Sequence, residues 1–191
     1  MIFVGLTGGI GSGKSEALAA CRRLGAATLS SDEVVHELLG TQEVRDLLAE
    51  RWGSDALSRE EIAEIVFDKP DELAWLEGVL FPRVGQRMAA WRAGLESSED
   101  GSDVAVVEVP LLFEAGVDGA FDATIAIVAD ENLREERASA RGHRGVEGRE
   151  ARQLSQDEKA GRADFIVQND GTLEDLEAAM GRLLQRLKAS R

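Results

Sequence analysis

Residues Gly8 to Ser15 have the types and the spacing that bind a polyphosphate. They match the pattern G-x-x-x-x-G-K-[ST], in which glycines let successive backbone N–H groups turn inward on an anion without a Cβ in the way. The lysine of this pattern reaches the β- and γ-phosphates, and the hydroxyl that follows it can ligate Mg²⁺. We therefore predict a site for ATP or GTP with Mg²⁺, formed by Gly9, Gly11, Ser12, Gly13, Lys14 and the metal ligand Ser15.

The residues on either side supply the structural context that a phosphate loop needs. The apolar run Ile2–Leu6 predicts a buried strand before the loop, and a helix is expected from Lys14 to a glycine cap at Gly25. The apolar residues at helical spacing are Ala17, Leu18, Cys21 and Leu24. Such a helix directs the positive end of its dipole at the bound anion. A chance glycine-rich turn is therefore the weaker interpretation.

A carboxylate follows the second predicted strand. Ala26–Leu29 is a short apolar run that suits a parallel strand, and it ends at Ser30, Ser31 and Asp32. Ligands of open α/β sheets bind at the carboxyl ends of the strands, so we expect Asp32 at the ligand-binding edge. The competing interpretation makes Asp32 an N-cap of the helix that follows, and the two roles can coexist.

The rest of the pattern predicts an α/β fold. Apolar runs at 104–109, 124–128 and 165–168 predict further strands, whereas residues 41–93 read as helical throughout, with Pro82 expected to open a helix. Thr172 and Asp175 form a capping-box-like start for a C-terminal helix. Alternating strands and helices favour a P-loop, three-layer α/β/α fold with a parallel sheet of five strands.

We expect residues 1–191 to form a single domain with three parts. A nucleotide-binding core would comprise 1–38 and 104–191, with a helical substrate-binding insertion at 39–103. A lid region is expected at 137–160, because five arginines there alternate with glycines: Arg137, Arg141, Arg144, Arg149 and Arg152. Such arginines neutralise charge on a transferring phosphoryl group. The competing interpretation is a solvated charged helix, since glutamates are interleaved with them.

The composition restricts the partners and the compartment. The chain has 36 acidic against 22 basic residues, a net charge of −14, which disfavours nucleic acid and anionic membrane surfaces. The sequence shows no apolar stretch of membrane-spanning length and no signal peptide. The single cysteine, Cys21, is expected to pack in the core. We predict a cytoplasmic protein that acts on a small molecule and has no obligate protein partner.

One segment of the chain imitates a guanine-binding motif. Asp68-Lys69-Pro70-Asp71 imitates the guanine-reading segment of a GTPase. However, no D-x-x-G lies between it and the phosphate loop, and its surroundings read as helix, so we interpret it as a helix break at proline. Small-molecule phosphoryl transfer is the activity that remains.

The order of the motifs along the chain is itself distinctive. The segments are Leu6–Ser15, Ser31-Asp32 with His36, Arg59 with Ile65–Phe67, Phe81-Pro82, Val109–Glu114, Gln153–Lys159, Ala163-Asp164 and Asn169–Gly171. Together and in this order they resemble the dephospho-CoA kinase family, which catalyses the last step of coenzyme A synthesis. The resemblance covers nearly the whole chain.

The resemblance implies a mechanism and assigns residues to it. ATP, as co-substrate, and Mg²⁺ would lie on the phosphate loop, and the ribose 3′-hydroxyl of dephospho-CoA would attack the γ-phosphate. Lys14, Asp32 and Arg141 are the catalytic candidates. The resemblance also implies ATP contacts from Arg137, Arg149, Asn169 and Gly171, and dephospho-CoA contacts from Asp32, His36, Arg59, Pro110, Leu111, Leu112 and Glu114.

Three positions depart from the family pattern, and alternatives stay open. Glu16 stands where a second hydroxyl is usual, Ser30 replaces a common Asp, and Phe81 replaces a frequent His. A nucleoside monophosphate or shikimate kinase shares the loop and lid but lacks the Pro110–Glu114 segment. A nucleotide-binding switch without catalysis is the alternative from another class, and Glu16 and Ser30 are the features that favour it.

Overall fold

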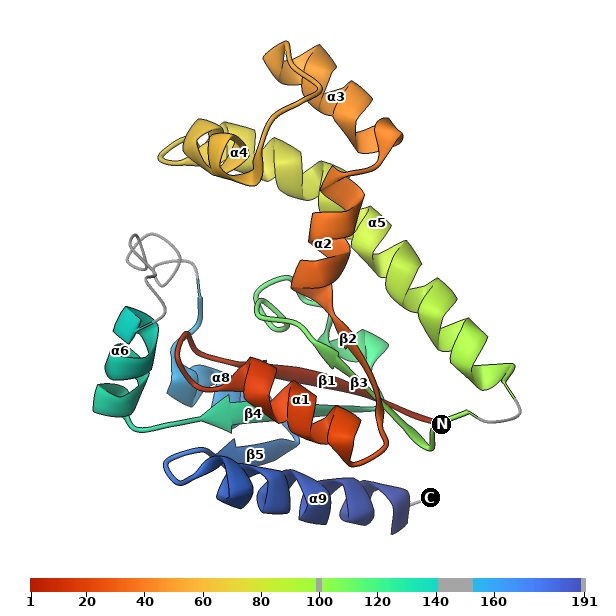
Figure 1. The fold of residues 1–191 in the computed structure, drawn as a ribbon, viewed down its shortest axis with the longest axis vertical. Coiled ribbons are helices and arrows are strands. Elements are labelled where there is room, and N and C mark those ends of the chain that lie inside the picture. The colour runs from red at the N-terminus through yellow and green to blue at the C-terminus, as the bar shows by residue number, and fades with distance from the viewer. Residues whose placement is uncertain (99–100, 141–152, 190–191) are drawn as a thin grey trace. The chain divides into compact units, whose positions relative to one another are not determined.

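The computed structural model describes residues 1–98, 101–140 and 153–189, which form two compact units. One unit comprises residues 1–30 and 95–191, and the other comprises residues 31–94. The first unit contains a five-stranded sheet in the order β2-β3-β1-β4-β5 (Figure 1). The strands are β1 (Ile2–Gly8), β2 (Ala27–Ser30), β3 (Val104–Glu108), β4 (Ala123–Val128) and β5 (Phe165–Gln168).

All strand pairs of the sheet are parallel, as the alternating pattern predicts. β1 lies in the middle, where Ile2 pairs with Val104 of β3 and Val4 pairs with Ala123 of β4. Every residue of β3 and β4 is buried, as expected for a parallel sheet that helices cover on both faces. The phosphate loop therefore follows the central strand at its carboxyl end.

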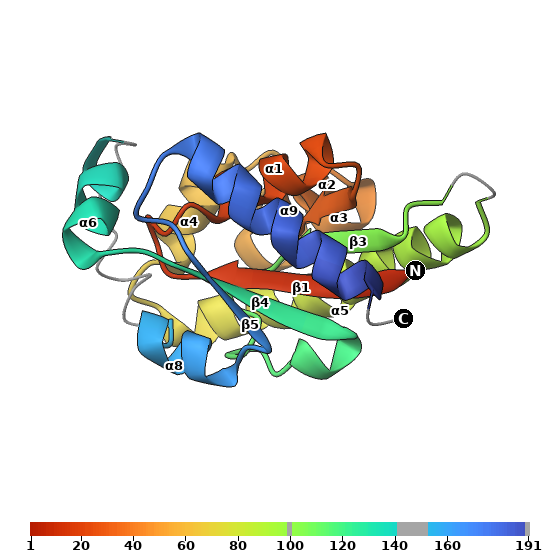
Figure 2. The ribbon, with the colours of Figure 1, turned by 90° about the horizontal axis from the view of Figure 1, so that it is seen from below.

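Helices cover both faces of the sheet (Figure 2). Helix α1 (Lys14–Arg23) and helix α9 (Leu173–Ala189) pack against each other on one face, and α8 (Gln156–Arg162) lies on the other. A short 3-10 helix η1 (Asp118–Ala120) precedes β4, and α6 (Glu131–Ala140) follows it. The core between α1, α9 and the sheet is apolar and includes Leu6, Cys21, Ile125 and Met180, all with less than 1% exposure.

The ends of α1 and α9 confirm two predicted caps. Gly25 follows α1 in the left-handed region with φ 84°, and Thr172 exchanges hydrogen bonds with Asp175 in a capping box before α9. Leu24 and Leu173 are exposed. Leu24 follows the last residue of α1, and Leu173 is the first residue of α9.

The second unit consists of helices, as the periodicity of residues 41–93 predicts. Its helices are α2 (Ser31–Leu39), α3 (Gln42–Trp52), α4 (Arg59–Val66) and most of α5 (Pro70–Glu96). An aromatic contact joins α3 to α5, where the rings of Trp52 and Trp75 meet edge to face at 5.1 Å. Glu72 accepts hydrogen bonds from Trp52 and Arg51 at the same junction.

The prediction that Pro82 opens a helix is wrong, because Pro82 lies inside the 27-residue helix α5. A proline in a helix interior removes one hydrogen bond and costs about 3 kcal/mol. Leu76 and Leu80, which precede Pro82, are buried, and their apolar packing stabilises the helix against this cost. The Arg83 guanidinium also donates to the Val79 carbonyl in the same turn. The helix break is correctly predicted at Pro70, which starts α5 after Asp68 in the left-handed region.

Candidate active site

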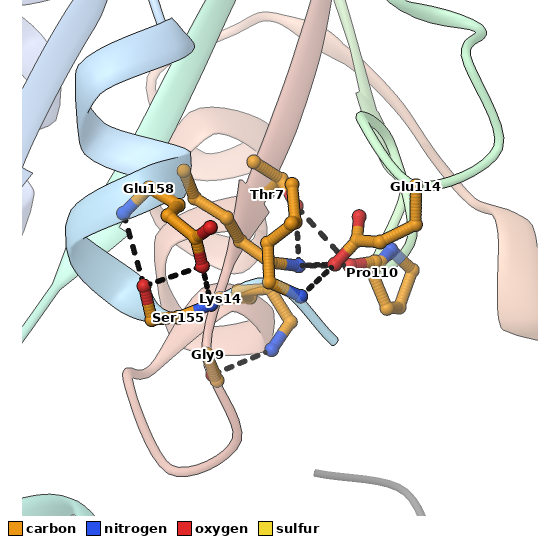
Figure 3. A network of polar contacts seen from close by, with 9 residues as sticks. Thr7, Gly9, Lys14, Pro110, Glu114, Ser155 and Glu158 are labelled. Carbon is orange, nitrogen blue, oxygen red and sulfur yellow. Dashed lines mark hydrogen bonds and ion pairs between the residues drawn. The ribbon is translucent and has the colours of Figure 1, made fainter. Parts of the chain in front are cut away.

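The phosphate loop closes on itself before α1 begins. The Lys14 ammonium donates to the Gly9 carbonyl at 2.8 Å (Figure 3). The Ser12 backbone N–H donates to the same carbonyl at 3.2 Å. Gly11 and Gly13 have φ of 76° and 93°, a region that residues with a Cβ rarely adopt. The loop thus holds the lysine over its own backbone.

Two neighbouring elements explain why the loop needs glycine. Arg134 of α6 donates from Nε to the Ile10 carbonyl at 3.0 Å, and its guanidinium would lie 3.1 Å from a Cβ at Gly9. A Cβ at Gly11 would collide with the Arg134 backbone carbonyl. At Gly13 a Cβ would collide with the Asn169 amide. Arg134 is a contact that the sequence does not reveal, since nothing marks it among the arginines of its segment.

Asn169 joins the end of β5 to the phosphate loop. Its Nδ2 donates to the Ser12 carbonyl at 2.8 Å, and the side chain is buried. Arg137 donates to the Asn169 carbonyl at 3.0 Å, so two of the predicted ATP-binding residues are in contact. Gly171 packs against Asp175, which caps α9. The structure therefore brings Arg137 and Asn169 together beside the loop.

A hydroxyl and a carboxylate meet at the start of α1. Ser15 Oγ donates to Glu108 Oε1 at 3.4 Å, and Glu108 is a buried residue at the end of β3. Sequence reasoning missed Glu108, although a carboxylate ending an apolar strand beside the central one is a recognisable signal. No cluster of three or more His, Cys, Asp or Glu that could hold a metal occurs in the described ranges. Oxygen donors from a hydroxyl and a carboxylate suit Mg²⁺, which keeps waters and phosphates as its other ligands.

The Pro110–Glu114 segment forms a turn after β3 that a buried lysine holds in place. Lys159 of α8 has no exposed side-chain surface and lies 3.0 Å from Glu114 Oε1. Its Nζ also donates to the Pro110 carbonyl. Burial lowers the pKa of Lys159, and the hydrogen bond and charge of Glu114 oppose that shift. Leu112 is wholly buried and faces Gly5 of β1, which gives it a packing role; Leu111 is half-buried.

Three predicted substrate-binding residues of the helical unit surround one cleft. Asp32, His36 and Arg59 line a space of about 480 Å³ together with Glu33 and Glu37. Asp32 and His36 are exposed and lie one turn apart on α2. The cleft combines two positive or ionisable nitrogen groups with carboxylates, an arrangement that can bind both the phosphates and the hydroxyls of a small molecule.

Asp32 does not take the N-cap position. Helix α2 starts at Ser31, so Asp32 is in its first turn. Within the described residues no backbone N–H donates to its carboxylate. The negative charge still interacts favourably with the helix dipole, but the carboxylate oxygens remain available to a ligand.

Glu16 lies beside the phosphate loop, and its side chain lines a separate depression. This space of about 390 Å³ is bounded by Glu16 and Arg23 of α1 and by Leu173, Glu174 and Glu177 of α9. The pair Arg23–Glu177 bridges the two helices at 2.6 Å. Glu16 therefore faces the neighbouring helix. The predicted residues Arg141 and Arg149 lie outside the described residues.

A phosphate loop that follows the middle strand of an all-parallel sheet, flanked by helices, defines the class of P-loop nucleotide-binding proteins. Structural comparison agrees: a shikimate kinase from Acinetobacter baumannii shares the fold, with a TM-score of 0.55 and 12% identity over 100% of this chain and 95% of that chain. The protein TT1252 from Thermus thermophilus aligns with a TM-score of 0.79 and 34% identity over 97% of both chains.

The sequence comparisons narrow the class to one family. The family model of the dephospho-CoA kinases matches residues 2–175. A dephospho-CoA kinase from Protochlamydia amoebophila is 37% identical over 97% of this chain and 96% of its own length. The chain belongs to the dephospho-CoA kinase family, whose members are transferases that phosphorylate dephospho-CoA at the expense of ATP. No helix in the described ranges is long and apolar enough to span a bilayer.

Proposed function

We propose that this protein transfers the γ-phosphoryl group of ATP to the ribose 3′-hydroxyl of dephospho-CoA, giving coenzyme A and ADP. The observation that carries the proposal is the phosphate loop with Lys14 held at Gly9, in a chain that matches its family from residue 2 to 175. In this reaction a bond forms between the 3′-oxygen and the γ-phosphorus. The bond from that phosphorus to the β,γ-bridging oxygen breaks, and ADP leaves.

Side chains of the phosphate loop, of α2 and of the arginine-rich segment have different roles in the proposed reaction. Lys14 stabilises negative charge on the phosphates as the bond to ADP breaks. Asp32, whose carboxylate is exposed in its cleft, accepts the proton of the attacking hydroxyl. Arg137, which holds the Asn169 carbonyl, contributes positive charge beside the nucleotide, and Arg141 and Arg149 are proposed to add to it.

Ser15 and Glu108 are the proposed protein contacts of Mg²⁺. Their oxygens lie 3.4 Å apart at the start of α1, and both are hard donors of the kind that Mg²⁺ prefers. The ion supplies neutralisation of phosphate charge during transfer. A Ser15→Ala variant should require a higher Mg²⁺ concentration for half-maximal activity, and an unchanged Mg²⁺ dependence would refute the assignment.

The cleft of the helical unit is the proposed contact with dephospho-CoA. Arg59 and His36 bind its diphosphate, and Asp32 binds its ribose hydroxyl, because these residues line one space of a size that suits a small ligand. Pro110 is proposed to contact the same substrate, whereas the Glu114 carboxylate is paired with Lys159 and accepts the Leu154 N–H. A cytoplasmic location, without nucleic-acid, membrane or obligate protein partners, completes the proposal.

The experiment is a coupled ADP-release assay with ATP and Mg²⁺, in which dephospho-CoA is compared with AMP, CMP, UMP and shikimate. The expected result is ADP release that depends on dephospho-CoA, with coenzyme A identified by mass as the product. A Lys14→Ala variant, run in parallel, should lose the activity. Turnover with shikimate or a nucleotide alone would overturn the substrate assignment, and ATP binding without any turnover would instead favour the nucleotide-binding switch.

A further inference from the structure

A fully buried lysine, Lys159, contacts the turn formed by Pro110–Glu114. Within the described ranges Lys159 is the largest of the fully buried side chains. Its Nζ lies 3.0 Å from Glu114 Oε1 and 3.5 Å from Thr7 Oγ1, and it donates to the Pro110 carbonyl. Figure 3 shows Thr7, Pro110 and Glu114 gathered in one network of polar contacts.

The contacts of Lys159 and Glu114 together join three different parts of the unit that contains the sheet. Thr7 is the residue before Gly8 of the phosphate loop, and its hydroxyl donates to the Pro110 carbonyl at 3.3 Å. Glu114 ends the turn after β3, and its Oε1 also accepts the backbone N–H of Leu154 at 2.8 Å. One ammonium and one carboxylate therefore connect the strand before the loop, the turn after β3, and the segment that leads into α8.

Stability alone does not explain such a pair. Removing two charges from water costs several kcal/mol per ion in proteins, and a buried pair often stabilises a fold no better than apolar residues of the same volume. What a buried, hydrogen-bonded pair supplies is a fixed geometry, set here through Glu114 Oε1, while Glu114 Oε2 is buried without a partner in the described residues. Here that geometry concerns the backbone of Pro110 and the carboxylate of Glu114, two groups on the turn that follows β3.

We propose that Lys159 and Glu114 are positioning residues for the kinase reaction. They hold the Pro110–Glu114 turn in a fixed position relative to Thr7, the residue before the phosphate loop, so that the turn receives the phosphoryl acceptor. The inference rests on the proposed function, since it assigns the turn to the acceptor. It predicts that loss of the pair impairs the use of dephospho-CoA and leaves the binding of ATP unchanged, because the loop's own contacts, Lys14 to Gly9 and Asn169 to Ser12, do not involve Lys159.

The test separates positioning from stability with a paired substitution. Lys159→Met leaves Glu114 buried without its partner and should lower the melting temperature. In Lys159→Met/Glu114→Gln the charge is gone from both sides, and the glutamine Oε1 still accepts the Leu154 N–H, so the melting temperature should recover. The kinetic defect should persist: kcat/KM for dephospho-CoA about tenfold or more below wild type, with the Kd for ATP within twofold. Lys188→Met, which removes an exposed lysine paired with Asp103, is the matched control.

A second variant decides the question if the double variant does not fold. Thr7→Val keeps the shape of the buried side chain and removes its hydroxyl from the Pro110 carbonyl. It should raise KM or lower kcat for dephospho-CoA by a few fold at constant ATP affinity. The proposal is overturned if the double variant regains both stability and full kcat/KM, or if Thr7→Val weakens ATP binding alone. Wild-type turnover of dephospho-CoA, measured in the same series, distinguishes this failure from failure of the proposed function.

Discussion

The Asn169 amide donates a 2.8 Å hydrogen bond to the Ser12 carbonyl, and this bond fastens the end of β5 to the phosphate loop. The resemblance to the family implies an ATP contact from Asn169. The structure gives its side chain a second task, because the Ser12 carbonyl lies inside the loop that must keep its shape. The residue that we propose as an ATP contact is thus also a support of the phosphate loop.

Removal of the Asn169 amide is expected to loosen the loop. Asn169→Ala leaves the Ser12 carbonyl buried without its donor, which costs about 1–3 kcal/mol of unfolding free energy, and the KM for ATP should rise several fold. Gln168→Ala is the control, since the Gln168 amide donates to the exposed Asp170 at the same strand end. Chemical denaturation and steady-state kinetics measure both effects. Equal behaviour of the two variants would contradict the support role.

Substitution of two glycines that have nearly the same left-handed φ should affect the activity differently. Gly11 and Gly53 have φ of 76° and 78°, so a Cβ is strained at both. Only at Gly11 does the new Cβ also meet a neighbour, the Arg134 carbonyl, whereas the space at Gly53 is open. Gly11→Ala should abolish most activity and Gly53→Ala should cost about 1 kcal/mol of stability with activity retained.

Both variants are compared by melting temperature and by kcat/KM for ATP. If Gly53→Ala were as inactive as Gly11→Ala, the loss would come from global strain, and the close packing of α6 on the loop would not be its cause.

Asp32 should be needed for the chemistry and not for the fold. Asp32→Asn keeps the size of the side chain and removes its capacity to accept a proton, so kcat should fall at least 100-fold, within the range known for general bases. The melting temperature should stay within about 2 °C, because no backbone N–H in the described residues depends on this carboxylate.

The matched control for this variant is Asp71→Asn. Asp71 occupies the first turn of α5 as Asp32 occupies that of α2, and it is likewise exposed. Any loss that comes only from a weaker interaction with a helix dipole should appear in both variants. A kcat for Asp32→Asn as high as that of Asp71→Asn would remove Asp32 from the mechanism.

The Cys21 thiol should make stability fall at high pH. Burial raises its pKa from 9.0 to about 12, so above pH 9 the unfolded chain releases a proton that the folded chain retains. The contribution to stability is therefore complete below pH 9 and is lost as the pH rises toward 12. Unfolding by urea at pH 7.5 and 10.5 checks this. The stability difference between wild type and Cys21→Ala should shrink at the higher pH, and a constant difference would contradict the shift.

The sequence was sufficient to predict those parts of the molecule in which a local pattern carries the information. The phosphate loop, the five strands and the capping box at Thr172 depend on neighbours in the chain, and each appears as predicted. Pro82 was misjudged because a proline in a helix is a local penalty that packing along 27 residues overcomes. The family of the chain also followed from its motifs.

Contacts between distant segments could not be predicted in the same way. Arg134 meets the loop at Ile10, Lys159 meets Thr7, and Glu108 meets Ser15 only after the sheet has brought them together. Nothing in the residue types of Arg134 or Lys159 distinguishes them from solvated neighbours. For the cleft, the sequence named Asp32, His36 and Arg59 separately, and the packing of α2 with its neighbours in the helical unit placed them around one space.

The position of β1 in the sheet has a consequence for how the chain folds. Its two partners are β3 and β4, and the pairs Ile2–Val104 and Val4–Ala123 show how far along the chain these lie. During synthesis the strand that carries the phosphate loop must wait, unpaired and apolar, until both partners have been made, which takes of the order of 5–25 s at ordinary translation rates. The helices of residues 31–94 can form in that interval, because these residues make one compact unit from a single continuous segment. Substitutions that make β1 more apolar are thus expected to lower the yield of folded enzyme through aggregation of nascent chains, even where the finished protein is no less stable.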